Sequence, residues 1–275
     1  MQNNQEQDFP YWLVAVIGLG LYFGYRVVAD DLYVQVFNIV SKGVGLTLFV
    51  TFVAFFAASV IGLGLALASL SRWLVLRQMA RFYIEIIRGI PILVLLLYVA
   101  FVGAPALVAL INWIGAPLGF EEMRTRDLSL MWRAVLALMV GYSAFIAEVF
   151  RAGLQSVDPG QIEAAKALGL SPWHRFRFIV FPQALRTILP PLGNDFVAMI
   201  KDSSLVSVVG VADITQLGKT YAAGSFRYLE TYNIVALIYL TMTITLSLAL
   251  RRFERHMWRK EAERKGKSND QPPIA

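Results

Sequence analysis

The chain has 275 residues, of which 57% are hydrophobic and 16% charged, with 25 Lys and Arg, 19 Asp and Glu and no cysteine. Soluble domains average about 25% charged and about 45–50% apolar residues, so this composition predicts a protein that folds in lipid. The absence of cysteine excludes thiol catalysis, Cys-ligated zinc and iron–sulfur clusters.

Long apolar segments recur along the chain. A bilayer core needs roughly 17–25 mostly apolar residues for each spanning helix. Candidate spans are residues 11–28, 43–70, 90–114, 131–150, 186–211 and 234–250, the fifth being interrupted by Pro190-Pro191 and several charges. The sequence therefore predicts an all-α membrane protein, a helical bundle of about six transmembrane helices.

The basic residues are concentrated in three places: between the second and third spans, after the fourth, and beyond Leu250. Short cytoplasmic loops collect Lys and Arg, so we expect these segments and both termini on the cytoplasmic side. The formal net charge of +6 is then a consequence of topology. No segment outside the spans is large enough for a folded basic domain, so nucleic acid is not an expected partner.

One predicted cytoplasmic loop carries strong helix-end signals. Asp158, Pro159 and Gln161 form an N-cap, a first-turn proline and a capping-box partner. Gly169 lies where a left-handed C-terminal cap is expected. The sequence predicts a short helix between these signals and a second one starting at Ser171-Pro172.

Such a short helix is marginal alone in water, so it needs a packing partner. Ile162, Ala165 and Leu168 recur at helical spacing and form a narrow apolar stripe. The stripe is compatible with packing on the chain's own membrane domain and equally with docking into a separate soluble protein. The residues themselves leave both interpretations open.

Several motifs at fixed mutual spacing resemble the ABC importer permeases, in particular the polar amino acid uptake subfamily. The coupling loop of that family matches Glu163-Ala164-Ala165, Gly169, Ile179 and Pro182, with Phe181 where Leu is usual. Further matches are Gly45-x-Thr47-Leu48, Glu85-Ile86-Ile87-Arg88-Gly89-Ile90-Pro91, Ala147 to Ser156, Pro182 to Arg186 and Lys201-Asp202-Ser203-Ser204-Leu205. The resemblance covers roughly residues 43–252.

The resemblance implies a domain organisation. Residues 1–42 would form an N-terminal tail, the first transmembrane helix and an outer loop. The permease core would span residues 43–252 and include a coupling loop over 152–182, followed by a basic cytoplasmic tail over 253–275. The expected location is the bacterial plasma (inner) membrane.

The same resemblance implies a role and partners. The coupling helix would contact an ATPase through Glu163, Ala164, Ala165, Leu168 and Gly169. Expected partners are two ABC ATPase subunits, a second permease that is identical or homologous, a solute-binding protein and an amino acid substrate. The chain itself would not be an enzyme and would bind no cofactor, since ATP and Mg would bind the partner ATPases.

Ionisable residues inside a membrane segment usually face a cavity or pair with one another. Asn194, Ala198 and Lys201 share one helical face, and Asp195, Met199 and Asp202 share the adjacent one. The candidates for a substrate path are Glu148, Asn194, Asp195, Lys201, Asp202 and Ser203. A zwitterionic amino acid needs an anion and a cation as partners, and this set has both. The competing interpretation is a structural ion-pair network around Lys201.

Two other function classes remain as alternatives. An ion-coupled secondary amino acid carrier would use Glu148, Asp195 and Lys201 as its relay. An intramembrane enzyme would need a nucleophile, and the sequence offers no plausible one.

Two further features are rejected as sites. Gly218-Lys219-Thr220 is not a phosphate loop, because such a loop needs a glycine five residues before Gly218, where this chain has Asp213. His174 and His256 are far apart in sequence, so no metal site is expected.

Overall fold

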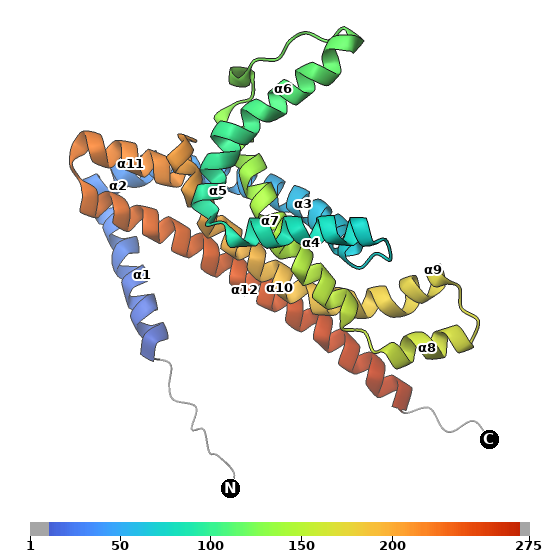
Figure 1. Cartoon of the computed structure of the whole chain (residues 1–275). Helices are drawn as coiled ribbons and strands as arrows, with labels where there is room; N and C mark the ends of the chain where they lie inside the picture. Colours follow the sequence, from blue (N-terminus) through green and yellow to red (C-terminus); the bar gives the residue numbers. More distant parts are fainter. Residues whose placement is uncertain (1–10, 270–275) are drawn as a thin grey trace. The chain divides into compact units, whose positions relative to one another are not determined.

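The computed structural model describes residues 11–269, apart from the side chains of residues 12, 13 and 256–269. The described chain is helical and contains no strand, which confirms the predicted all-α class (Figure 1). The α-helices are α1 (Tyr11–Ala29), α2 (Asp31–Val40), α3 (Val44–Ser69), α4 (Leu74–Gly89), α5 (Ile92–Tyr98), α6 (Ala104–Gly115), α7 (Leu130–Gln155), α8 (Pro159–Ala167), α9 (Pro172–Arg175), α10 (Phe181–Asp202), α11 (Ile214–Ser225) and α12 (Tyr228–Asn269). Short 3₁₀ or π turns join them: η1 (Ser41–Gly43), η2 (Val99–Gly103), η3 (Ala116–Leu118), η4 (Thr125–Asp127), η5 (Phe176–Val180) and η6 (Ser203–Val209).

Four helical segments of the described residues are long and apolar enough to cross a membrane: Asp31–Ser69, Ile92–Leu118, Leu130–Gln155 and Tyr228–Arg255. A shorter apolar helix covers Val14–Ala29. These segments include the predicted spans 131–150 and 234–250 whole, and most of the predicted spans 11–28, 43–70 and 90–114. The fifth predicted span overlaps most of α10, which runs as one helix through Pro190 and Pro191 instead of breaking there. The number of crossings stays a prediction.

The chain divides into two compact units. The first consists of Met1–Leu46 and Ala212–Met242, and the second of Thr47–Val211 and Thr243–Ala275. In the first unit, α11 and the start of α12 pack with α2. The predicted organisation into an N-terminal segment, a permease core and a basic tail stays a prediction. The long α12 contributes to both units.

The first unit has its own apolar core. It is built from α2, α11 and α12, with Tyr33, Val36, Val40, Ile214, Ile234, Val235 and Ile238 buried together. Asp213 caps α11 by accepting a hydrogen bond from the Gln216 backbone N–H at 2.8 Å, and a second from the Tyr239 hydroxyl at 3.1 Å. Burial raises the pKa of the Asp213 carboxyl, while these hydrogen bonds oppose the rise. Gly218-Lys219-Thr220 lies within helix α11, so it is not a phosphate-binding loop.

The second unit is organised around α7. Its buried residues are mostly small, including Ala134, Ala137, Ala144 and Ala147, which lets neighbouring helices approach closely. Helix α4 is tied to α7 by the Tyr83 hydroxyl, which lies 3.1 Å from the Val140 carbonyl and 2.9 Å from the Ser143 hydroxyl. Helices α4, α5 and α10 all pack on α7. This helix therefore sets the spacing of the groups that line the site described below.

A close backbone approach in the first unit requires glycine. A Cβ on Gly43 would lie 2.6 Å from the Asp213 carbonyl carbon, too close for any real contact. The Asp213 carbon belongs to the backbone, so a rotamer change cannot relieve the clash. The η1 turn and the start of α11 must therefore separate to accept a side chain.

We expect Gly43→Ala to lower the free energy of unfolding by about 1–3 kcal/mol, the usual cost of overpacking a tight contact. The measurement is thermal unfolding of the detergent-solubilised chain. Gly45→Ala is the matched control, because no atom lies within 4 Å of a Cβ built there. An equal effect of the two substitutions would contradict the packing account.

Candidate substrate pocket and coupling surface

A cavity of about 500 Å³ with both charged and apolar walls lies where α4, α5, α7 and α10 meet in the second unit. It is lined by Arg88, Gly89, Ile90, Pro91, Ile92, Tyr142, Phe145, Asp195, Ala198 and Asp202. Local sequence explains one wall: Pro91 disfavours helix at Ile90, which is extended (φ −94°, ψ 131°). Helix α4 therefore ends at Gly89, and Arg88 is left in its last turn, at the rim of the cavity.

The cavity contains charges of both signs. The Arg88 guanidinium lies over the Phe145 ring, 5.8 Å from its centre. The Asp202 carboxylate accepts a hydrogen bond from the Tyr142 hydroxyl at 2.7 Å. The second acid, Asp195, has its Oδ2 atom buried without a hydrogen-bond partner in the described part of the chain. A buried carboxylate oxygen left unpaired is costly, so this atom is suited to accept a hydrogen bond from a ligand.

Only some of the predicted substrate-path residues line the cavity. Asp195 and Asp202 line the cavity together with Ala198. Asn194 and Lys201 are exposed and Ser203 is fully buried, and none of the three lines the cavity. The Ser203 hydroxyl donates to the Ile200 carbonyl at 2.7 Å.

The predicted ion-pair network around Lys201 is not formed in the described residues. Glu148 pairs instead with Arg151, three residues later on the same helix. Arg88 is the cation that lines the cavity, and it was not among the predicted substrate-path residues. Its signal was present in the Arg88-Gly89-Ile90-Pro91 stretch, where a basic residue directly precedes a helix break.

The predicted coupling helix is present as α8, and its capping residues act largely as expected. The Asp158 carboxylate accepts from the Gly160 backbone N–H at 2.7 Å. Gly169 adopts φ +73°, a left-handed conformation that favours glycine. The expected capping box differs, because the Gln161 side chain accepts a hydrogen bond from Gln183 at 2.6 Å. Figure 1 shows α8 and α9 side by side beyond the ends of α7 and α10.

The apolar stripe of α8 is divided between two environments. Ala165 is buried, and Ile162 packs on a cluster formed by Val157, Ala184 and Ile188. Leu168 is 81% exposed, and Glu163 and Ala164 are exposed beside it. One side of α8 thus anchors it to the chain's own helices. The other leaves a large apolar side chain in water, where it is available to a partner.

Comparison with known proteins identifies the family. The model of the binding-protein-dependent transport system inner membrane component family matches residues 58–259. The chain belongs to this family. Membership confirms the resemblance carried by the Glu163-Ala164-Ala165 loop and its flanking motifs.

Individual members of the family are similar over most of the chain. The glutamine transport system permease protein GlnP of Escherichia coli (strain K12) is 37% identical over 216 residues, 78% of this chain and 91% of that protein. The probable amino-acid ABC transporter permease protein YckA of Bacillus subtilis (strain 168) is 39% identical over 212 residues, 76% of this chain and 84% of that protein. A crystal structure of an amino acid ABC transporter with histidines matches with a TM-score of 0.68 and 38% identity, covering 81% of this chain and 96% of the other.

The hydrogen bond between Tyr142 and Asp202 joins α7 to α10 inside the cavity. We expect Tyr142→Phe to destabilise the protein by about 1.5–3 kcal/mol. This is the usual contribution of a hydrogen bond to a charged group, and Phe cannot donate one to the Asp202 carboxylate. The measurement is the shift in thermal unfolding in detergent. Tyr98→Phe is the control, since Tyr98 is 60% exposed. Equal stability of Tyr142→Phe and the wild type would show that the hydrogen bond contributes nothing.

Proposed function

We propose that this chain is the membrane-spanning subunit of an ATP-driven importer, and that it carries an amino acid through the cavity between Arg88 and Asp195. The observation that carries the proposal is the presence of opposite charges, Arg88 with Asp195 and Asp202, in the lining of one cavity. A zwitterion presents a carboxylate to Arg88 and an ammonium group to Asp195 and Asp202. The names of the similar permeases, which include glutamine and amino-acid transport, support the substrate class.

The proposed mechanism is alternating access. A solute-binding protein delivers the amino acid on the outer side of the membrane, to a path between this permease and a second one, identical or homologous. Two ATPase subunits bind ATP and Mg, close on one another and pull on α8. The exposed Leu168, Glu163 and Ala164 form the contact with the ATPase, while Ile162 and Ala165 hold α8 to the membrane domain. A pull on α8 is thereby transmitted to α7 and α10.

The ion-coupled carrier is the weaker candidate. An ion relay through Glu148, Asp195 and Lys201 requires the three side chains to lie close together. Instead, Glu148 pairs with Arg151, and Lys201 is exposed outside the cavity. A carrier driven by an ion gradient also has no use for a docking helix with an exposed Leu168. Family membership favours the importer as well.

Substitution of Arg88 tests the substrate role of the cavity. We expect Arg88→Gln to raise the KM for uptake by about 10-fold to 100-fold, the loss of one charge-assisted hydrogen bond of about 1.5–3 kcal/mol. The assay measures ATP-dependent uptake from an amino acid panel, starting with glutamine, by the complex reconstituted in vesicles. Arg81→Gln is the matched control, because Arg81 is also exposed on α4 but does not line the cavity. An unchanged KM in Arg88→Gln would contradict the proposal that the substrate passes through the cavity.

A second test separates coupling from folding at the end of α8. Asp and Asn both tolerate a left-handed φ, so Gly169→Asp and Gly169→Asn place similar strain on the turn. Only Asp adds a charge to the proposed docking surface. We expect Gly169→Asp to abolish substrate-stimulated ATP hydrolysis by the purified complex and Gly169→Asn to retain most of it. Normal stimulation in Gly169→Asp would overturn the coupling role of this surface.

A further inference from the structure

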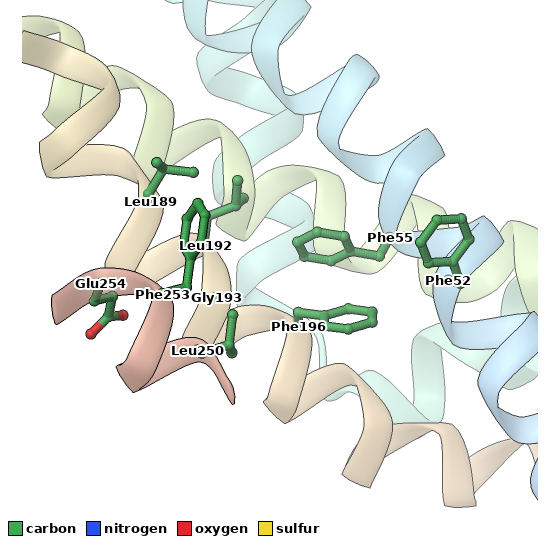
Figure 2. A pocket seen from close by; sticks show the side chains of 9 residues that line it. All are labelled: Phe52, Phe55, Leu189, Leu192, Gly193, Phe196, Leu250, Phe253 and Glu254. Carbon is green, nitrogen blue, oxygen red and sulfur yellow. The ribbon is translucent and has the colours of Figure 1, made fainter. Parts of the chain in front are cut away.

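An amino acid that leaves the cavity between Arg88 and Asp195 needs charged or polar partners along its path. The groove between α3, α10 and α12 in the second unit does not supply them (Figure 2). Among the described residues that line it there is one acid, Glu254, and no basic residue. Figure 2 shows the rings of Phe55 and Phe196 facing one another from α3 and α10, with their centres 4.8 Å apart. This apolar groove therefore does not continue the path of a zwitterion.

A row of polar side chains instead follows α7 away from the cavity. The row starts at Phe145, which lines the cavity beneath the Arg88 guanidinium. Glu148 and Arg151 come next, one and two turns further along the helix. Arg151 pairs with Glu148 and donates a hydrogen bond to the side chain of Gln155, the last residue of α7, at 3.1 Å. The row thus leads from the wall of the cavity to the end of α7 that precedes α8.

Helix α4 adds a second carboxylate to this row. Glu85 lies three residues before Arg88, so the two side chains are neighbours on the surface of α4. The Glu85 carboxylate attracts the Arg151 guanidinium across the contact between α4 and α7. Glu85 is exposed, and within the described part of the chain it forms no salt bridge with Arg81 or Arg88. Its charge is therefore available to a ligand.

The charges of this row repeat those of the cavity. The cavity combines one guanidinium, that of Arg88, with two carboxylates. Arg151, Glu148 and Glu85 supply the same set nearer to the α8 end of α7. An arginine side chain has five N–H donors, so Arg151 can bind a substrate carboxylate and keep its hydrogen bond to Gln155. Both sets suit a ligand that carries an ammonium group and a carboxylate on one carbon.

A purely structural role explains the row less well. Glu148 and Arg151 belong to the same helix, so their salt bridge does not hold two helices together. Their side chains are 26% and 36% exposed, and exposed pairs of this kind contribute little to stability. Helix α7 is otherwise apolar enough to cross a membrane, where charged groups usually face a polar path or a partner.

We propose that Glu85, Glu148 and Arg151 form a second subsite, which receives the amino acid as it moves from the cavity toward the α8 end of α7. This inference rests on the proposed function, since it extends the path that begins at Arg88. In the second subsite the substrate carboxylate displaces Glu148 from Arg151. The ammonium group then binds Glu85 and the released Glu148. The α8 end is also where the proposed ATPase contact lies, so the amino acid leaves on that side of the membrane.

Substitution of Glu85 tests the second subsite, and the assay is ATP-dependent glutamine uptake by the complex reconstituted in vesicles. We expect Glu85→Gln to lower the maximal rate of uptake by about 10-fold and to leave the KM unchanged, because the cavity keeps all its charges. Glu85→Asp retains a carboxylate and is expected to recover most of the rate. Glu121→Gln is the matched control, because it makes the same change at an exposed acid between η3 and η4, outside both α4 and α7.

Three results would overturn the second subsite. The first is wild-type uptake by Glu85→Gln, which would leave the cavity proposal standing, since the KM of Arg88→Gln tests that proposal separately. The second is a raised KM with an unchanged maximal rate, which would assign Glu85 to the cavity itself. The third is an equal loss of uptake in Glu85→Gln and Glu85→Asp, which would assign the effect to packing instead of charge.

Discussion

The cost of placing charged groups among packed apolar helices is the constraint on which the rest of this structure depends. A charge removed from water is costly unless it is paired or hydrogen-bonded, so it persists only beside a partner or a cavity. Arg88, Asp195 and Asp202 are placed around one cavity, and Tyr142 satisfies Asp202 from α7. The small residues of α7 bring α4, α5 and α10 close enough for these groups to share that space. The substrate proposal follows from this arrangement, because a zwitterion can complete the interactions that the protein leaves open.

Helix α8 likewise depends on contacts outside itself for its stability. A helix of nine residues is too short to be stable by itself, and its stability comes from its caps and from Ile162 and Ala165. These residues occupy one side of the helix and leave Leu168 in water. The two interpretations that the apolar stripe allowed are therefore compatible. One side is used for attachment to the membrane domain, and the other is free for the proposed ATPase contact.

Local features of the sequence predicted local structure well. The helical class, the position of α8, its Asp158 cap and the left-handed Gly169 depend on residues close together in the chain, and the structure has all of them. The groups around the cavity come from helices far apart in sequence, and periodicity does not show how α10 is rotated against α7. Met199 was expected on the same face as Asp195 and Asp202, yet it is fully buried and Ala198 lines the cavity in its place. Likewise Ile162 and Leu168 differ by about 120° around a regular helix, wide enough for packing to separate them.

The central claim is that the exposed side of α8, and not its buried side, contacts an ATPase. Because the chain has no cysteine, one introduced cysteine is its only reactive thiol. The measurement is cross-linking of Leu168→Cys and, separately, Ala165→Cys to the subunits that purify with the tagged chain, with and without ATP. The account predicts a strong cross-link from residue 168 to an ATP-hydrolysing subunit and little from residue 165. Absence of that cross-link, or an equal one from residue 165, would contradict it.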